Sequence, residues 1–217
     1  MTVWQSPGTA ARYDRYNQQF PLYATTSARL AAAADIPVGA RVLDLGCGTG
    51  VTTKALLARV GAAGQVLAVD SSAAMLRTAR ANVKADNVSW HEGDVRDVDR
   101  LVAGPVDAAV SNMAFWQFDL GPTLAAVARL LTAEGSLAFS IGYRVEPEVG
   151  AVVGHWRAAL RDNGYDLFQV RRSEHRESAH SLREWSRLAL VGGAGQARSD
   201  DGPWTLHTLY FRCRPTR

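Results

Sequence analysis

One acidic residue and three glycines stand together in the segment RVLDLGCGTG. Asp44 lies in the apolar run, and Gly46, Gly48 and Gly50 alternate with other residues directly after it. Glycines let a backbone come very close to a ligand. A dinucleotide-binding loop would need a further glycine at Val51, and a phosphate loop would need Gly-Lys-Ser/Thr. Since neither pattern is present, we expect a loop that approaches its ligand through the backbone without gripping a phosphate.

Two further aspartates follow the next two apolar runs. Asp70 ends VLAVD, where a carboxylate can accept both hydroxyls of a ribose and would repel a 2′-phosphate. Asp94, in HEGDV, can accept a hydrogen bond from an exocyclic amine, with a backbone N–H next to it for a ring nitrogen. Taken singly, Asp70 could instead cap a helix and Asp94 could be a turn residue. Three acids at three successive strand ends favour an adenosine site.

A predicted alternation of strands and helices positions these residues. The predicted strands are 41–45, 65–70, 87–91, 106–111, 135–142, 166–173 and 203–213, and the predicted helices are 49–60, 71–83, 121–131, 147–164 and 181–191. Ser71 or Ser72 is expected to cap the second helix. Strands joined through helices imply an α/β fold with right-handed crossovers and a parallel sheet, with the ligand beyond the carboxyl ends of the strands. The connection before the last strand favours an antiparallel edge.

Residues 1–24 stand outside this alternation and are predicted to form a helical lid segment on a domain of residues 25–217. The spacing of the aromatic residues in this segment would place them on one face of a helix, at Tyr13, Tyr16, Phe20 and Tyr23. That face either packs on the body of the domain or lines a ligand pocket.

Composition limits the class of protein. The 217 residues are 47% hydrophobic and 21% charged, which is typical of a soluble globular domain. We expect no transmembrane helix and no signal peptide, and with two cysteines neither a disulfide framework nor a metal site, which favours a cytoplasmic location. All but two of the 24 basic residues are arginine, and they are interleaved with acids. A solvated surface is therefore expected, with no nucleic-acid or membrane partner.

As a set, the motifs VLDLGCGTG, VLAVDSS, GDV and VDAAVSNMAFWQF resemble the class I S-adenosylmethionine-dependent methyltransferases over residues 36–142. The resemblance implies a Rossmann-like, seven-stranded mixed sheet ordered 3-2-1-4-5-7-6, with strand 7 antiparallel and helices on both faces. It also implies S-adenosyl-L-methionine as cofactor and S-adenosyl-L-homocysteine as product.

The resemblance assigns cofactor-binding roles to particular residues. Asp44 and the backbone of the three glycines would face the methionyl part, and Asp70, with Ser71 beside it, would bind the ribose. The adenine would be held by Asp94 and the backbone N–H of Val95. Ser111 would offer its carbonyl to the cofactor's amino group.

Candidate substrate contacts follow the fourth and fifth strands. The segment SNMAFWQF would place Asn112, Phe115 and Trp116 near the methyl group, with Tyr13 contributed by the lid. Aromatic walls suit an apolar or planar acceptor and attract the sulfonium. Phe115 could instead pack under the following helix. Arg144 could bind a substrate carboxylate or phosphate, or pair with Glu146 or Glu148.

The sequence offers no clear general base. His155 and Tyr16 are the candidate catalytic residues, and positioning of the nucleophile is expected to supply most of the catalysis. The chain is therefore predicted to methylate carbon or oxygen of a small molecule, as in secondary metabolism, and to act as a monomer or homodimer. The alternatives are a carrier-protein-linked carboxyl methyltransferase of biotin synthesis and a domain that binds the cofactor without methyl transfer.

Overall fold

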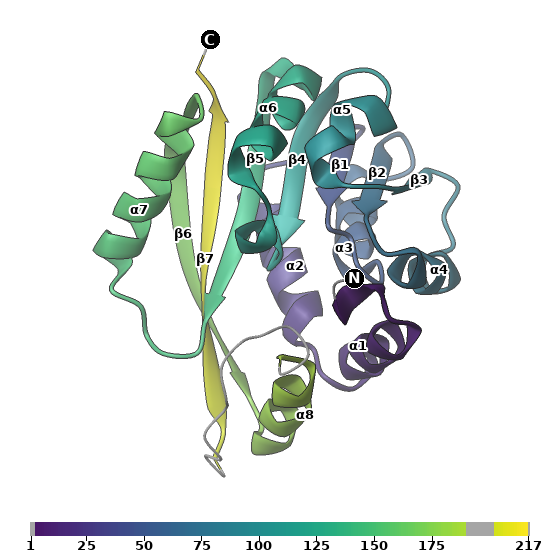
Figure 1. The fold of residues 1–217 in the computed structure, drawn as a ribbon, viewed down its shortest axis with the longest axis vertical. Coiled ribbons are helices and arrows are strands. Elements are labelled where there is room, and N and C mark those ends of the chain that lie inside the picture. Colours follow the sequence, from purple (N-terminus) through teal and green to yellow (C-terminus); the bar gives the residue numbers. More distant parts are fainter. Residues whose placement is uncertain (1–2, 190–201, 217) are drawn as a thin grey trace.

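The computed structural model describes residues 3–189 and 202–216, and these form one seven-stranded sheet ordered β3-β2-β1-β4-β5-β7-β6 (Figure 1). The strands are β1 (Arg41–Leu45), β2 (Gln65–Asp70), β3 (Val88–Glu92), β4 (Val106–Asn112), β5 (Leu131–Tyr143), β6 (Tyr165–Glu177) and β7 (Trp204–Pro215). Strand β7 is antiparallel to β5 and β6, and the other neighbouring strands are parallel. The expected α/β fold, strand order and antiparallel strand are confirmed.

Helices cover both faces of the sheet. They are α1 (Pro7–Gln19), α2 (Leu22–Ala33), α3 (Val51–Val60), α4 (Ala73–Asn82), α5 (Val98–Leu101), α6 (Leu120–Leu130), α7 (Val149–Asp162) and α8 (Ala179–Ala189), with short 3₁₀ turns η1 (Val3–Gln5), η2 (Val95–Asp97) and η3 (Phe115–Gln117). Helices α2, α3 and α4 pack on one face, and α5, α6 and α7 on the other. Helices α1 and α8 lie beyond the carboxyl ends of the parallel strands (Figure 1).

The central strands are apolar on both faces because each face is buried under helices. In β1, Leu43 and Leu45 belong to the core beneath α5, α6 and α7, whereas Val42 belongs to the core beneath α2 and α3. This double burial fixes the strand positions and leaves the carboxyl edge of the sheet for the loops that can contact a ligand.

The prediction of a single N-terminal helix that carries the aromatic residues is wrong, because they lie on two helices and the turn between them. Helix α1 ends before Pro21, because the ring of a proline disfavours helical backbone in the preceding residue. Phe20 is accordingly extended, with φ −128° and ψ 134°. The aromatic rings still cluster: the centroids of Tyr13 and Tyr23 are 5.1 Å apart, and those of Tyr16 and Phe20 are 4.9 Å apart. The two helices therefore form a bent unit, and residue 24 lies inside α2.

Other differences from the expected elements are local. Helix α3 begins at Val51 and not at residue 49, because Gly50 has a left-handed backbone, with φ +87°. The short η2 and α5 were not predicted, and β6 continues to Glu177 in its pairing with β7. The end of the predicted helix 181–191 lies outside the described residues.

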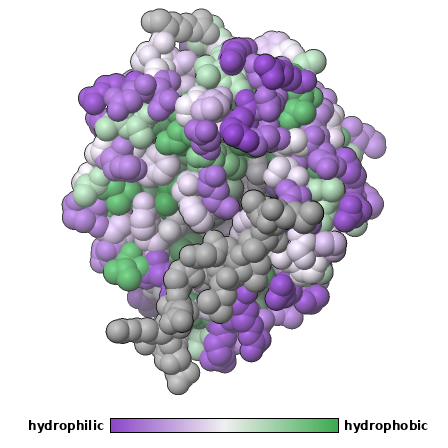
Figure 2. Space-filling model, viewed as in Figure 1, coloured by the Kyte–Doolittle hydropathy of each residue, from purple (hydrophilic) through white to green (hydrophobic). Residues whose placement is uncertain are grey.

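The surface is mixed in polarity. The face shown in Figure 2 has hydrophobic residues scattered among hydrophilic ones. In the described ranges, no helix combines the length and the apolar character that crossing a membrane requires.

Candidate active site

A cavity of about 630 Å³ opens at the carboxyl edge of the parallel strands. It is lined by the loops after β1, β2, β3 and β4, by η1, α1, α2 and α8, and by residues of β5 and β7. This volume lies in the range of small-molecule and cofactor sites. The position agrees with the expectation that a ligand binds beyond the strand ends.

Two of the three predicted glycines line this cavity. Gly46 has φ +70° and Gly48 has φ +54°, a backbone region that glycine enters without penalty. A Cβ at Gly46 would lie 3.1 Å from Cζ of Phe118, so a larger residue would crowd the cavity wall. Gly50 does not line the cavity; a Cβ there would lie 2.9 Å from Val83, which explains this glycine by packing against α4.

The carboxylate of Asp70 accepts two backbone hydrogen bonds but does not cap α4. Its Oδ2 accepts the backbone N–H of Gly48 at 2.8 Å, and its Oδ1 accepts the N–H of Ser72 at 2.8 Å. The carboxylate also lines the cavity, and each oxygen retains a second lone pair for a ligand hydroxyl. Burial raises the pKa of Asp70 above its usual value, with the two N–H donors acting in the opposite direction. Ser72, and not Ser71, caps α4 by accepting the N–H of Met75.

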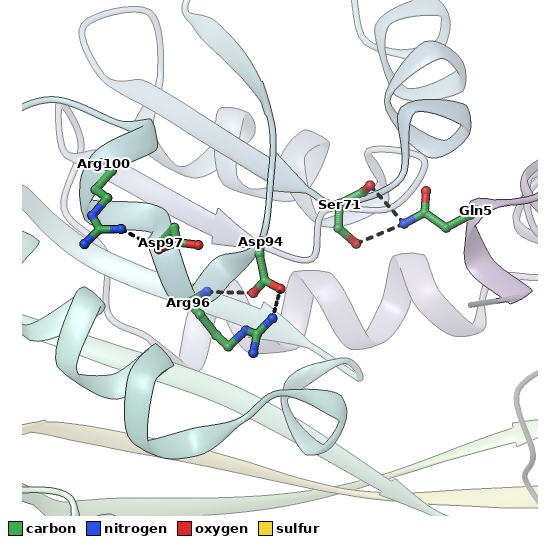
Figure 3. Close-up of polar contacts among 6 residues, drawn as sticks. All are labelled: Gln5, Ser71, Asp94, Arg96, Asp97 and Arg100. Carbon is green, nitrogen blue, oxygen red and sulfur yellow. Dashed lines mark hydrogen bonds and ion pairs between the residues drawn. The ribbon is translucent and has the colours of Figure 1, made fainter. Parts of the chain in front are cut away.

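Asp94 and Val95 reach the cavity after β3. The two oxygens of Asp94 accept the backbone N–H of Arg96 at 2.9 Å and its Nη2 at 2.8 Å (Figure 3). This contact lowers the pKa of the Asp94 carboxyl. Asp94 is therefore a turn residue that also faces the cavity, and Arg96 is a lining residue that the sequence did not point out.

The side chains of Asp44 and Ser111 do not reach the cavity. Asp44 is 1% exposed, and its Oδ2 accepts the hydroxyl of Thr53 at 2.7 Å. Its Oδ1 has no partner among the described residues, and burial raises the pKa of this carboxyl to about 7. Ser111 is fully buried, and its predicted contact through the backbone carbonyl stays a prediction.

The N-terminal segment crosses the cavity mouth. The indole N–H of Trp4 donates to Oε1 of Gln117, in η3 after β4, at 3.1 Å. After β2, Gln5 donates to the carbonyl of Ser71 at 3.0 Å (Figure 3), and the Ser72 hydroxyl donates to the carbonyl of Trp4 at 2.7 Å. These contacts bring Ser71 to the cavity edge and support the predicted lid. Trp4 and Gln117 were missed because each lies in a short 3₁₀ turn without periodicity.

The predicted aromatic contacts divide between the cavity and the core. Tyr13 and Trp116 line the cavity, and a Cβ at Gly48 would lie 3.7 Å from the Tyr13 ring. Phe115 is fully buried and stacks on Phe139 with ring centroids 4.2 Å apart, so its packing alternative is the correct one.

Asn112 lines the cavity, but hydrogen bonds to protein groups hold its amide. It donates to Thr26 and Ser27 on α2 and accepts the Ser140 hydroxyl at 2.6 Å. Ser140 in turn accepts the backbone N–H of Met113, whose φ is +57°. We conclude that Asn112 supports the strained turn that presents Met113 to the cavity.

Neither predicted catalytic residue lies at the cavity. Tyr16 is 2% exposed and hydrogen-bonds Ser181 at 2.9 Å, and burial raises the pKa of its hydroxyl well above the usual value. His155 is exposed on α7, which packs on the sheet face over β5, β6 and β7. Helix α7 lies along the sheet (Figure 1), and His155 is not among the residues that line the cavity.

Arg144 also stays outside the cavity lining, with its guanidinium carbon 6.0 Å from the ring centroid of Trp185. The alternative that it pairs with a nearby glutamate is wrong. Glu146 pairs with Arg172 at 2.6 Å, and Glu148 caps α7 by accepting the N–H groups of Gly150 and Ala151.

In the ranges 3–189 and 202–216, no cluster of histidine, cysteine or acidic residues is arranged to hold a metal ion. The groups that the described lining residues offer a ligand are carboxylates, backbone donors and apolar walls.

Comparisons with known proteins find similarity to methyltransferases. Residues 42–135 match the family model described as a methyltransferase domain. A malonyl-[acyl-carrier protein] O-methyltransferase of Bacillus cereus is 31% identical over 136 residues, 61% of this chain and 49% of that protein. A 2-phytyl-1,4-naphtoquinone methyltransferase of Thermosynechococcus vestitus is 39% identical over 90 residues, 39% of each chain. This chain thus spans half or less of the length of these curated relatives.

The fold comparison extends over most of the chain. A methyltransferase from Thiobacillus denitrificans, solved with S-adenosyl-L-homocysteine, has a TM-score of 0.58 and 18% identity, covering 88% of this chain and 91% of that one. The resemblance to the class I S-adenosylmethionine-dependent methyltransferases is confirmed: the chain has their fold and carries a methyltransferase domain.

Proposed function

We propose that this protein transfers a methyl group from S-adenosyl-L-methionine to carbon or oxygen of a small-molecule acceptor. The observation that carries the proposal is Asp70: a carboxylate on the cavity wall, oriented by the N–H groups of Gly48 and Ser72. A carboxylate held in this way suits the two hydroxyls of a ribose.

The surrounding residues suit the rest of an adenosine. Asp94 and the N–H of Val95 would meet the adenine edge, with Arg96 sharing the carboxylate, and the backbone of Gly46 and Gly48 would face the methionyl tail. The glycine loop carries no basic side chain that would suit a phosphate. Asp44 lies beneath this loop with its side chain turned toward Thr53, so it would act on the methionyl tail only through its electrostatic field.

The cofactor would supply an activated methyl group on a sulfonium, so the acceptor needs orientation more than activation. Tyr13, Trp116 and Met113 would hold the acceptor beside that methyl group. The described residues that line the cavity include no histidine, which supports catalysis mainly by positioning.

A second candidate is methylation of a carboxyl group on a carrier protein. It is favoured by the similarity to the malonyl-[acyl-carrier protein] O-methyltransferases, 31% identical over 136 residues in the Bacillus cereus protein. Arg144 pairs with no acid among the described residues, but it lies outside the cavity lining, so it would serve as the counter-charge only after a movement into the cavity.

The test is incubation of the protein with methyl-labelled S-adenosyl-L-methionine and metabolite pools or malonyl-carrier protein, followed by mass spectrometry. A labelled small molecule supports the first candidate, and a labelled carrier supports the second. Binding of the cofactor without any labelled product would support a domain that binds without transfer.

A further inference from the structure

The cavity has two halves of different chemistry. Among the described residues that line it, the charged side chains come from the end of β2 and from the segments after β3 and β4, namely Asp70, Asp94, Arg96 and Asp119. The other half, here called the apolar half, is formed by Leu22, Tyr23, Met113, Trp185, Leu188 and Leu206. Among the described residues that line the cavity, none in the apolar half carries a charge.

One polar group of the apolar half, the hydroxyl of Tyr23, still has a proton that it can donate in a hydrogen bond. The indole N–H of Trp185 donates to the hydroxyl oxygen of Tyr23 at 3.2 Å. A tyrosine hydroxyl has one proton and accepts through its oxygen, so Tyr23 acts as acceptor in this contact. Within the described part of the chain, the Tyr23 hydroxyl makes no second hydrogen bond. Burial raises the pKa of Tyr23, so the hydroxyl keeps its proton at neutral pH.

We propose that the apolar half binds the acceptor as an uncharged, planar molecule, with an oxygen that accepts a hydrogen bond from the Tyr23 hydroxyl. This inference rests on the proposed function, since the acceptor has to share the cavity with the cofactor. Aromatic rings and a methionine sulfur suit a planar, polarisable ligand.

The same walls disfavour a carboxylate acceptor. A carboxylate in the apolar half would lose its hydration, and no opposite charge is found among the described residues that line that half, so its burial there is costly. Arg144 is not among the residues that line the cavity, and its guanidinium lies over the ring of Trp185, 6.0 Å from the ring centroid, in a cation–π arrangement. The inference therefore separates the two candidate functions by the charge of the acceptor.

Three matched probes test the inference: 2-naphthol, 2-naphthoate and naphthalene, titrated into the protein saturated with S-adenosyl-L-homocysteine at pH 7.5. The wild type is expected to bind 2-naphthol about tenfold or more tightly than 2-naphthoate. Tyr23→Phe should weaken 2-naphthol about fivefold, the typical effect of one lost hydrogen bond, and leave naphthalene unchanged. Tyr210→Phe is the control, because that hydroxyl bonds Ser173 outside the cavity and its loss should alter none of the three affinities.

The outcomes distinguish this inference from the proposed function. Failure of S-adenosyl-L-homocysteine to bind the wild type would overturn the proposed function itself. If it binds, equal affinities for 2-naphthol and 2-naphthoate, or no binding of any probe, would overturn the inference. A loss of naphthalene and 2-naphthol binding to the same degree in Tyr23→Phe would also overturn it, since the ring and not the hydroxyl would then be responsible. The wild-type comparison needs no variant and holds even if Tyr23→Phe folds poorly.

Discussion

The backbone N–H of Gly48 donates a 2.8 Å hydrogen bond to Oδ2 of Asp70. This contact ties the glycine loop after β1 to the end of β2, 22 residues later in the chain. It orients the carboxylate toward the cavity while leaving lone pairs for a ligand. The loop and the acid therefore act as one unit, and the site depends on both.

Asp44 should make stability depend on pH. Its pKa is about 7 in the folded protein against an ordinary value of 3.8, because burial disfavours the charge. The folded state then holds the proton more firmly than the unfolded state, so stability falls as the pH rises from about 4 to about 7. The loss is on the order of 4 kcal/mol.

The measurement is urea unfolding of the wild type and Asp44→Asn at pH 5 and pH 8. The variant keeps an acceptor for the Thr53 hydroxyl but has no titratable group. The free energy of unfolding of Asp44→Asn should increase relative to that of the wild type as the pH rises. Parallel pH profiles for the two proteins would show that Asp44 is not responsible.

The N-terminal strap, η1 with its contacts to Gln117 and Ser71, should retain the bound ligand. Trp4→Ala removes the hydrogen bond to Gln117 and the edge-on contact with Tyr13. We expect the dissociation rate of S-adenosyl-L-homocysteine, measured by stopped-flow displacement, to rise about fivefold, the effect of about 1 kcal/mol. Gln18→Ala is the control, since Gln18 bonds only Asp14 on the exposed side of α1. Equal rates in both variants would argue against a strap.

Ser72 should contribute to stability as the cap of α4. Ser72→Ala removes the acceptor for the Met75 N–H and the donor to the Trp4 carbonyl. The expected cost is about 1 kcal/mol, or about 2–4 °C in melting temperature. Ser71→Ala is the matched control, because its hydroxyl is 3.5 Å from its one side-chain partner. Calorimetry that gave both variants the same melting temperature would contradict this assignment.

The sequence predicted the parts of the site that are local. Gly48 follows β1, Asp70 ends β2 and Asp94 follows β3, and their place in an α/β sheet brings them to one edge. Asp44 was misplaced because a strand alternates between two faces. In β1 the side chain of Asp44 shares the face of Val42, toward α3, where Thr53 binds it.

The acceptor side could not be read from the sequence. Tyr23 and Trp185 are 162 residues apart, and they meet because α8 packs against α1 near the start of α2. Tyr16 shares a helix with Tyr13, yet it contacts Ser181 on α8 and not the cavity. Contacts of this kind depend on how the helices pack at the end of the sheet, which periodicity does not specify.

Isothermal titration of S-adenosyl-L-homocysteine into the wild type, Asp70→Ala and Asp97→Ala tests the central claim most directly. Asp97 pairs only with the exposed Arg100 and does not line the cavity, so its variant should bind like the wild type. The account predicts micromolar or tighter binding to the wild type and a loss of about tenfold to a hundredfold in Asp70→Ala, as for hydrogen bonds to a charged group. No binding to the wild type, or equal affinity in Asp70→Ala, would contradict it.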